Sequence, residues 1–395
     1  MTGDKPLKIV IAADTYAPDV NGAAVFCFRL ATAMAERGHE VHVIAARADS
    51  GPTITELRPE ATVHRLKSYA VPTHETWRLC LPWEANKELR RLLAEIKPDV
   101  VHVQCHYMIG QAALQEARKL GVRTVATNHF MPENLDPFLP FPKFVKRIIA
   151  RNSWRDMGKI MGKANVVTTP TPLAAHAMRE RGRLEMVLPL SNGIDSSHYE
   201  LAAGETVESR PYPTILFAGR LAVEKNVNEL IEALNLMKHV PDAHLEVVGG
   251  GEQRAPLEKL ARDQGLADRV SFLGHVDDAE LRSAYLRCDV FCQPGTAELQ
   301  SLVTLEALSA SKPVVLANAM ALPHLVDDGV NGFLFEPGNR SDLAAKLDAV
   351  LAQDAAARAA MGEAGHAKAA IHSHAKTMDT FEALYRGASA AQFLP

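Results

Sequence analysis

The feature that most constrains the fold of this chain is an alternation of short apolar runs with helix-like segments. Lys8–Ala13 is a nearly uninterrupted apolar run that suits a strand buried on both faces. A helix-like segment follows at Ala23–Arg37 and stops at Gly38, and a second apolar run occupies Val41–Ala45. Such alternation is typical of a parallel sheet with helices on both faces. We therefore expect an α/β fold.

The alternation continues through the first half of the chain and begins again near residue 212. In the first half we expect helices at 84–96 and 111–119 and strands at 100–104, 123–127, 166–169 and 186–190. In the second half we expect strands at 214–218, 244–248, 270–273, 290–292 and 313–316 and helices at 226–237, 279–286 and 302–310. This predicts two Rossmann-like doubly wound parallel-sheet domains, 1–195 and 196–375, that face a cleft, because ligands bind beyond the carboxyl ends of such strands. The polar stretch 202–210 reads as the linker.

Charge is distributed unevenly between the two halves. Residues 1–195 hold 26 Lys and Arg against 20 Asp and Glu, whereas residues 196–395 hold 17 against 27. An acidic half argues against nucleic acid as a partner, because that binding needs many cations to neutralise phosphates.

The sequence shows no sign of a membrane span or of an oxidising compartment. No run approaches the roughly 18 apolar residues that cross a bilayer, and residues 1–8 are too polar for a signal peptide. Five cysteines without metal-like spacing read as reduced thiols. We expect a cytoplasmic protein.

Two cations follow the first strand of the second half. Gly219 and Arg220 come directly after strand 214–218, and Lys225 precedes the next helix. A helix N-terminus favours anions, and Arg and Lys beside it suit a diphosphate. Two solvated cations next to Glu224 are the alternative. The run Gly249-Gly250-Gly251 permits close backbone approach to a ligand or is simply a tight turn.

The most informative stretch runs from residue 293 to residue 306. Glu298 lies in the loop after a buried strand, and Glu306 lies about two turns into the next helix. A carboxylate accepts hydrogen bonds from neighbouring hydroxyls, so the pair suits a sugar and a ribose. The alternative is one Glu favoured by the helix dipole and one surface Glu.

These carboxylates are seven residues apart and resemble the E-x7-E motif of retaining glycosyltransferases of family 4, which have the GT-B fold. Other segments in the same order are similar to family positions, and together the match spans essentially the whole chain. They are Ala13–Ala23, with the first glycine loop; Ser191–Asp195; Gly219-Arg220-x4-Lys225; Gly249–Gly251; and Ala307–Val315.

The resemblance implies roles for individual residues. Arg220 and Lys225 would stabilise the leaving diphosphate, and His129 would face the donor sugar near the reacting carbon. Glu298, with the amides of Leu299 and Gln300, would hold that sugar. Glu306 would hold the ribose. The implied donor and nucleotide site comprises Gly22, Ala23, Gly219, Gly249, Gly250, His275, Leu299, Gln300, Ser301, Leu302, Val303 and Glu306.

The chain also departs from the family pattern. Leu299-Gln300 stands where the family usually has Phe-Gly, and Ala23 and Ser311 stand where it usually has Gly. Glu-x-Gln followed by Leu302-Val303 resembles the variant in enzymes that glycosylate diacylglycerol lipids. The resemblance implies an acceptor-binding first domain, a nucleotide-sugar-binding second domain and a segment 376–395 that crosses back to the first.

The implied chemistry needs no carboxylate nucleophile. The acceptor would attack from the face that the leaving group occupies, and a phosphate oxygen would take its proton. Cations preorganised at the leaving group are then the expected main source of catalysis. No Asp-x-Asp occurs in the sequence, so we expect no metal and no cofactor.

A basic segment at 137–163 accounts for the net positive charge of residues 1–195. Seven cations face the single acid Asp156, and six of the cations recur at i, i+4 spacing beside apolar residues. Such a segment suits an interfacial helix on anionic lipid or an ordinary helix packed by its apolar side. The membrane or acceptor residues would be Phe141, Lys143, Phe144, Lys146, Arg147, Arg151 and Arg155, with Phe138, Leu139, Val145, Ile148, Ile149, Lys159 and Lys163 in the same segment.

We therefore expect a retaining hexosyltransferase that uses a nucleotide sugar, with UDP favoured over GDP, and a lipid or lipid-linked acceptor at the inner face of the membrane. A soluble sugar, polyol or polysaccharide acceptor is the alternative within this class. A GT-B sugar-nucleotide epimerase and a non-catalytic nucleotide-sugar binder are alternatives from other classes.

Overall fold

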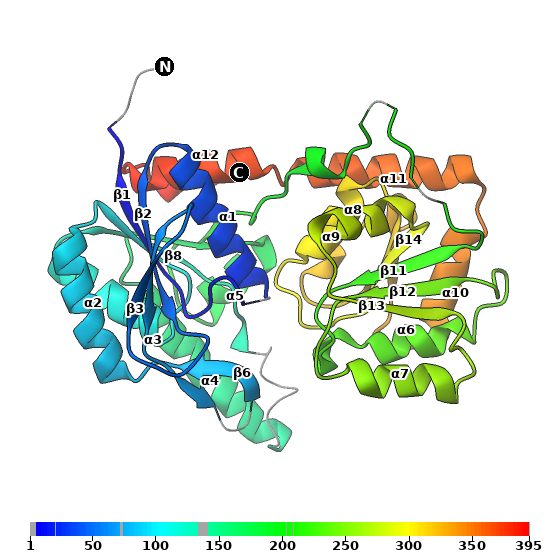
Figure 1. Ribbon diagram of the computed structural model, residues 1–395, viewed down its shortest axis with the longest axis horizontal. Coiled ribbons are helices and arrows are strands. Elements are labelled where there is room, and N and C mark those ends of the chain that lie inside the picture. The colour runs from blue at the N-terminus through cyan, green and yellow to red at the C-terminus, as the bar shows by residue number, and fades with distance from the viewer. Residues whose placement is uncertain are drawn as a thin grey trace. The chain divides into compact units, whose positions relative to one another are not determined.

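The computed structural model describes residues 5–19, 21–71, 74–132, 141–202, 204–207 and 209–394. The chain forms two compact units (Figure 1). Unit 1 consists of Met1–Ser191 together with Lys376–Pro395, and unit 2 consists of Asn192–Ala375. The boundary lies four residues before the expected one.

Unit 1 is built on an eight-stranded sheet with the order β10-β9-β8-β7-β1-β2-β4-β3. All neighbours pair in parallel except β3 with β4, which pair antiparallel. A separate hairpin is formed by β5 and β6. The bounds are β1 (Lys8–Ala12), β2 (Glu40–Ala46), β3 (Ile54–Leu57), β4 (Thr62–Leu66), β5 (Tyr69–Val71), β6 (His74–Leu79), β7 (Val100–Val103), β8 (Arg123–Thr127), β9 (Val166–Thr169) and β10 (Leu188–Pro189).

The helices of unit 1 bury small, aliphatic and aromatic residues. They are α1 (Gly22–Glu36), α2 (Pro82–Ile96), α3 (Met108–Lys119), α4 (Lys143–Met161), α5 (Pro172–Glu180) and α12 (His374–Tyr385). Lys163 and Phe141 of the basic segment lie outside α4, and Phe138 and Leu139 lie outside the described residues.

The last helix completes the core of unit 1. Phe381 of α12 is 1% exposed, and its ring lies 5.7 Å from that of Phe26 and 5.1 Å from that of His102. The hydroxyl of Tyr385 is 2.7 Å from Nδ1 of His102. Residues from the end of the chain therefore fill space between elements from its beginning.

Unit 2 has a six-stranded, wholly parallel sheet with the order β13-β12-β11-β14-β15-β16. Its strands are β11 (Thr214–Ala218), β12 (His244–Val248), β13 (Val270–Gly274), β14 (Val290–Gln293), β15 (Val314–Ala317) and β16 (Gly332–Phe335). Its helices are α6 (Val227–Leu234), α7 (Arg254–Asp263), α8 (Asp278–Arg287), α9 (Leu302–Ser309), α10 (Arg340–Leu351) and α11 (Ala355–Ala370).

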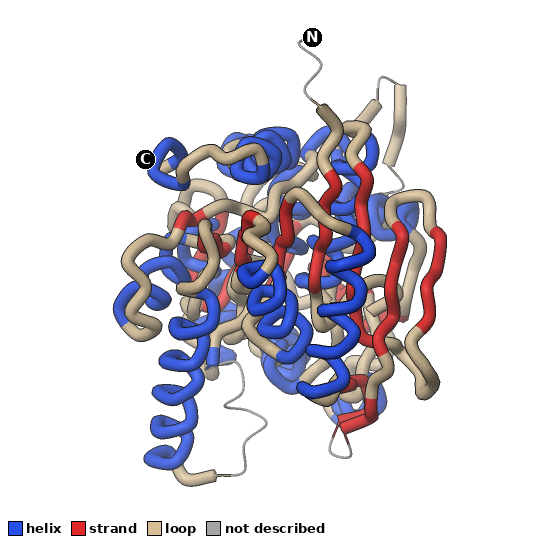
Figure 2. Tube along the Cα trace, turned by 90° about the vertical axis from the view of Figure 1, so that its left-hand side faces the viewer, coloured by secondary structure: helices blue, strands red, loops and turns tan. Residues whose placement is uncertain are grey.

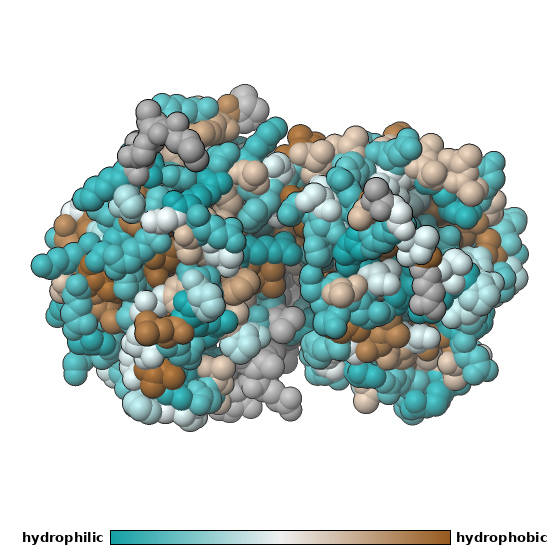
Figure 3. Space-filling model, turned by 45° about the horizontal axis from the view of Figure 1, so that its top comes forward, coloured by the Kyte–Doolittle hydropathy of each residue, from teal (hydrophilic) through white to brown (hydrophobic). Residues whose placement is uncertain are grey.

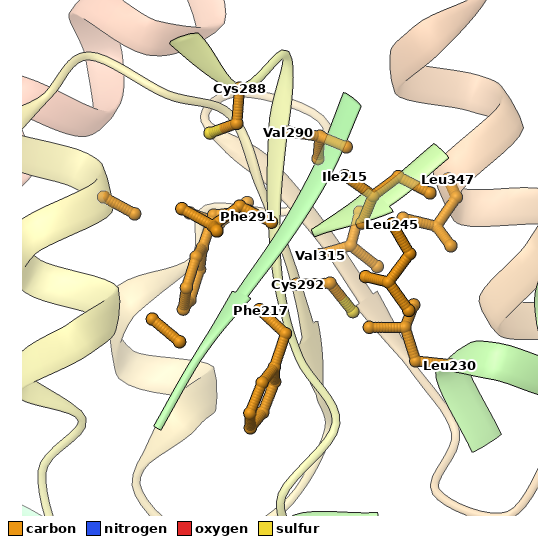
Figure 4. Close-up of a cluster of buried hydrophobic side chains, with 14 of the residues drawn as sticks. Ile215, Phe217, Leu230, Leu245, Cys288, Val290, Phe291, Cys292, Val315 and Leu347 are labelled. Carbon is orange, nitrogen blue, oxygen red and sulfur yellow. The ribbon is translucent and has the colours of Figure 1, made fainter. Parts of the chain in front are cut away.

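Apolar residues of these strands make the core of unit 2. Figure 4 shows Leu230 of α6 and Leu347 of α10 beside Ile215 and Leu245, all of them 0% exposed. A parallel sheet with helices on both faces needs such continuous apolar strands, which is the pattern seen in the sequence.

The expected linker at 202–210 was misplaced. This stretch belongs to unit 2, where Arg282 of α8 forms an ion pair with Glu205 and donates to the carbonyl of Glu200 at 2.6 Å. Its polar composition reflects these contacts with a neighbouring helix, which composition alone did not indicate.

Neither the face drawn in Figure 3 nor any described helix indicates a span across a bilayer. On the face that Figure 3 shows, hydrophilic residues cover most of the surface and hydrophobic ones lie in small separate groups. Within the described ranges, no helix combines the length and the apolar character that crossing a membrane requires.

Removal of the Phe381 ring should destabilise unit 1. Phe381→Ala leaves a cavity beside Phe26, which costs about 3–5 kcal/mol and lowers the melting temperature of unit 1 by on the order of 10 °C. Calorimetry of the full chain measures this shift. Phe144→Ala is the matched control, because that side chain is 66% exposed and should move the transition little. Equal shifts in both variants would contradict the packing of α12 on unit 1.

Candidate active site

The carboxyl ends of neighbouring strands in unit 2 bring two glycine loops into backbone contact. Gly219 follows β11 with φ of 149°, and Gly249 follows β12 with φ of 122°. A Cβ added to Gly249 would lie 2.0 Å from the carbonyl oxygen of Gly219, and one added to Gly250 would lie 2.7 Å from Nε2 of His275. Gly249 is therefore required by packing between the loops, whether or not a ligand also approaches it.

Both cations of the predicted diphosphate site have carboxylate partners. Arg220 donates to Oε1 of Glu224 at 2.6 Å, and Lys225 forms an ion pair with Glu298. The side chains of Arg220 and Lys225 are only 34% and 21% exposed. They are not freely solvated cations. The role at a diphosphate stays a prediction.

Backbone contacts hold the loops that carry these groups. The short 3-10 turn η3 (Val223–Lys225) ends at Asn226, whose side chain donates to the carbonyl of Pro294 at 3.3 Å. The N–H of Thr296 donates to the carbonyl of Glu224 at 3.2 Å. Lys225 and Glu298 are thus positioned by loops that follow the adjacent strands β11 and β14.

The loop after β14 leads into α9, as the sequence predicts. Ser301 caps the helix by accepting from the N–H of Thr304 at 3.4 Å. The N–H groups of Leu302 and Val303 lie in the first turn and have no partners inside the helix. Gln300 is 8% exposed, and its Oε1 accepts from the N–H of Asn192 at 2.9 Å. Leu299 is equally buried. Where the family usually has Phe-Gly, this chain therefore has two buried residues, Leu299 and Gln300, and the side chain of Gln300 binds the backbone of Asn192.

Glu306 is not a surface residue. It is 6% exposed, and its Oε2 accepts from the hydroxyl of Tyr285 at 3.0 Å. Complete burial, together with that neighbouring carboxylate, raises the pKa of Tyr285 well above its usual range, so the tyrosine stays a donor. The surface alternative for Glu306 was wrong, whereas the contact with a ribose stays a prediction.

Three polar atoms in this region belong to residues that received no individual role in the site from the sequence. Nε2 of Gln293, Oδ1 of Asn192 and Oε2 of Glu224 are buried and have no hydrogen-bond partner in the part of the chain that the structure describes. Gln293 ends β14 and is 0% exposed. A polar residue that closes an otherwise apolar strand is the signal that could have identified it.

The predicted donor residues of unit 1 lie in the first turn of α1 and just after β8. Gly22 begins α1 and has open space around its Cβ position, and Ala23 is half-buried in the first turn. Asn21 caps that helix by accepting from the N–H of Ala24 at 2.9 Å. Nε2 of His129 lies 2.9 Å from Oε1 of Gln104. Burial lowers the pKa of His129 to about 4, so its imidazole is neutral near pH 7.

Ser311 keeps the conformation of the glycine that it replaces. Its φ is 54°, in the left-handed region, at the residue that follows the end of α9. Its carbonyl oxygen would lie 2.0 Å from a Cβ at Gly362, so α11 packs closely there. The departure changes a side chain and preserves the turn.

The comparisons agree with this geometry. Residues 203–368 match the family described as glycosyl transferases group 1, and residues 20–198 match the one described as glycosyltransferase family 4. A D-inositol 3-phosphate glycosyltransferase of Frankia alni is 30% identical over 368 residues, which cover 85% of this chain and 87% of that protein. The chain belongs to glycosyltransferase family 4.

Two further matches are more distant in sequence. An α-monoglucosyldiacylglycerol synthase of Acholeplasma laidlawii is 24% identical over 350 residues, covering 83% of this chain and 85% of that one. The structure of Anabaena HepE in complex with UDP-glucose matches with a TM-score of 0.74 at 19% identity, and covers 97% of this chain and 100% of that one. The expected GT-B fold is confirmed.

Gly249→Ala should disrupt the junction of the two glycine loops. Its Cβ would meet the backbone of Gly219 and would require an L side chain at φ of 122°, so we expect a loss of about 2 kcal/mol or more in the stability of unit 2. Calorimetry measures it. Gly22→Ala serves as the control and should fold normally, because nothing lies within 4 Å of the added atom. Undiminished stability of Gly249→Ala would show that the loops move apart freely.

Proposed function

We propose that this family 4 glycosyltransferase moves a hexosyl unit from a nucleotide sugar to a membrane lipid or a lipid-linked acceptor, with retained configuration at the anomeric carbon and without a metal ion. The observation that carries the proposal is the pair of half-buried cation–carboxylate contacts, Arg220 with Glu224 and Lys225 with Glu298, at the carboxyl edge of unit 2. Parallel sheets bind ligands at this edge.

The cations suit the charge that develops in the reaction. When the bond between the sugar and the phosphate breaks, the electron pair goes to the diphosphate, which Arg220 and Lys225 would stabilise. The acceptor oxygen would bond to the anomeric carbon on the same face, and its proton would pass to the departing phosphate oxygen. Glu224 and Glu298 hold the cations in place, and Glu298 becomes available to sugar hydroxyls when the diphosphate takes over Lys225.

We favour a donor whose nucleotide is uridine diphosphate. Support comes from the resemblance of Glu298–Val303 to lipid glycosyltransferases and from the matching fold of HepE, whose structure contains UDP-glucose. Buried Glu306, already paired with Tyr285, offers its carboxylate to the ribose hydroxyls that every nucleotide donor shares. Guanosine donors are the alternative.

Arg220→Ala and Lys225→Ala should each lower kcat by roughly 100-fold or more, because each removes a preorganised cation from the leaving group. Steady-state release of the nucleoside diphosphate measures the effect. Lys259→Ala is the matched control, since Lys259 pairs with Asp263 on the surface of α7 and should leave turnover unchanged. Normal turnover in the first two variants would contradict the diphosphate site.

The N-terminal half of α4 supports a membrane acceptor. None of the residues from Phe141 to Asn152 is buried, and Phe144 and Ile148 are 66% and 47% exposed. The fully buried residues of α4 lie in its second half and are Trp154, Met157, Gly158 and Met161, whereas Val145, Lys146 and Ile149 of the first half are half-buried. Figure 2 shows the exposed half at the lower edge of the view, away from the strands. An ordinary helix packed along its whole apolar side does not describe this element.

The exposed half of α4 carries the composition of an interfacial helix. Its phenylalanines and isoleucines are flanked by exposed Lys143, Arg147 and Arg151, and each cation near an anionic surface contributes about 1 kcal/mol. We therefore propose peripheral binding at the cytoplasmic face of a membrane. The Acholeplasma relative, named for a diacylglycerol lipid, agrees with this placement.

Reversal of charge on α4 should abolish vesicle binding. Replacing Arg147, Arg151 and Arg155 with Glu should weaken binding to vesicles of phosphatidylglycerol and phosphatidylcholine at least about 100-fold, by the same charge arithmetic. Co-sedimentation measures it. A variant with Glu at Lys87, Lys238 and Arg262, which are exposed elsewhere, makes the same change in net charge and should still bind. An equal loss of vesicle binding in both variants would contradict a specific role for α4.

Three alternatives are separated by donor and product assays. A soluble acceptor predicts transfer to free sugars or polyols without vesicles, an epimerase predicts a changed nucleotide sugar without any acceptor, and a non-catalytic binder predicts binding without turnover.

A thermal-shift panel with UDP, GDP, ADP and their sugar conjugates comes first, because a ligand at 100 times its Kd adds roughly 2.7 kcal/mol to the free energy of unfolding. The stabilising donor is then supplied with each acceptor class, and the anomer of the product is determined by NMR. No stabilisation by any nucleotide would overturn the proposal.

A further inference from the structure

Three polar side chains at the carboxyl edge of the unit 1 sheet have hydrogen-bonding atoms without partners. Asp14, Gln104 and Asn128, here called the polar array, follow the adjacent strands β1, β7 and β8. Across the described residues, Oδ2 of Asp14, Nε2 of Gln104 and Oδ1 of Asn128 are buried and unpaired. Gln104 and Asn128 are 2% and 0% exposed. Each such atom costs about 1–3 kcal/mol, so three on neighbouring strands indicate a polar ligand.

Contacts at their other atoms prevent these side chains from turning to satisfy themselves. Oδ1 of Asp14 accepts from the N–H of Ile109 at 3.2 Å, in the first turn of α3. Nδ2 of Asn128 donates at 2.6 Å to a carbonyl two residues further along the chain. Oε1 of Gln104 lies 2.9 Å from Nε2 of His129. The array therefore presents two acceptors and one donor in fixed directions.

Two aromatic rings lie next to the polar array. The rings of Tyr107 and Phe130 are half-buried, with centroids 5.6 Å apart and planes at 61°. Tyr107 precedes the turn of α3 that binds Asp14, and the carbonyl of Phe130 is the one that Asn128 contacts. A pyranose or cyclitol ring has an apolar face of C–H groups as well as hydroxyls, so it can use both parts of this surface.

The polar array contains no cation. No Lys or Arg side chain is among the hydrogen-bond or ion-pair partners recorded for Asp14, Gln104 and Asn128 within the described ranges. Burial raises the pKa of Asp14 to about 6, and the Ile109 N–H opposes this shift. At pH 7 the carboxylate is thus negative and would repel a phosphate. Unit 2 has the opposite arrangement, with Arg220 and Lys225 at its edge.

We propose that the polar array binds the neutral, hydroxyl-rich ring of the acceptor, a sugar or a cyclitol head group, and selects it over a phosphorylated sugar and over bare diacylglycerol. Hydroxyls donate and accept, so several on one ring can satisfy all three unpaired atoms. Diacylglycerol offers a single hydroxyl. That this ligand is the acceptor rests on the proposed transferase function, whereas the neutral-ring site itself rests on the geometry of unit 1 alone.

Binding of defined probes tests the site independently of turnover. Saturation-transfer NMR on the full chain is run with octyl glucoside, octyl galactoside, octyl mannoside and myo-inositol, and with glucose 6-phosphate and octanol for comparison. The inference expects a neutral ring to bind at least about 10-fold more tightly than either comparison compound. Preference for the phosphate, or equal binding of octanol and the glycosides, would overturn it.

Near-isosteric variants locate the site. Asp14→Asn keeps the acceptor for the Ile109 N–H, and Gln104→Met and Asn128→Leu keep side-chain volume; each should weaken neutral-ring binding about 5- to 10-fold. The acceptor KM should rise by the same factor. Asn235→Leu and Gln353→Met, at exposed positions of unit 2, are the matched controls. Unchanged binding in all three array variants would overturn the inference.

A donor readout separates this inference from the proposed function. Stabilisation by UDP rests on the nucleotide residues proposed in unit 2, so it should be normal in the array variants, and calorimetry of unit 1 shows whether these are folded. If Asn128→Leu fails that check, Asn128→Asp, which retains both atom positions, replaces it. Absence of nucleotide binding in the unmodified protein would reject the transferase and leave a neutral-ring site, whereas normal stabilisation by UDP with unaltered acceptor KM would reject the site.

Discussion

Burial of both faces of each parallel sheet is the constraint on which the rest of this structure depends. Strand residues such as Ile215, Phe217 and Val290 are fully covered by helices, so a polar group inside a strand needs internal partners. Glu246 of β12 shows the requirement, because Arg287 and Arg210 both bind it. Groups that meet a ligand are therefore confined to the ends of strands, where the loops can be polar.

The two sheets use that edge differently. In unit 2 the edge gathers cations, each balanced by a carboxylate, together with a buried glutamate that holds a tyrosine hydroxyl. In unit 1 the edge carries Asp14, Gln104 and Asn128, each with one polar atom bonded and one without a partner, and no cation is bonded to them in the described ranges. The cations of unit 2 suit the charged diphosphate of the proposed nucleotide sugar, and the edge of unit 1, which has a carboxylate and no bonded cation, suits the neutral hydroxylated acceptor that we propose.

The helix α4 links this chemistry to a surface. Its second half is anchored where Gly158 lies so close to Gly182 that a Cβ would be 1.8 Å from the carbonyl oxygen of Gly182. Its first half has no fully buried residue; Phe144, Arg147 and Arg151 are exposed there, and Val145 and Lys146 are half-buried. Packing at one end thus leaves exposed aromatic and basic side chains at the other, and the proposed membrane contact rests on these side chains.

Periodicity and spacing determined from the sequence alone the alternating strands, the start of α9 at Leu302 and the position of Arg220, Lys225 and Glu298 in the loops after β11 and β14, because these depend on neighbours along the chain. The strands β3 to β6 and β16 were not predicted, since they are short, and polar residues such as Thr55, His64 and Arg78 interrupt the apolar runs of β3 to β6. Only the tertiary structure decided that Lys225 pairs with Glu298, that Glu306 is buried against Tyr285, and that Asp14, Gln104 and Asn128 meet at one edge. The physical reason is that pairing and burial depend on groups that are distant in sequence, whereas local patterns report only the element on which each residue lies.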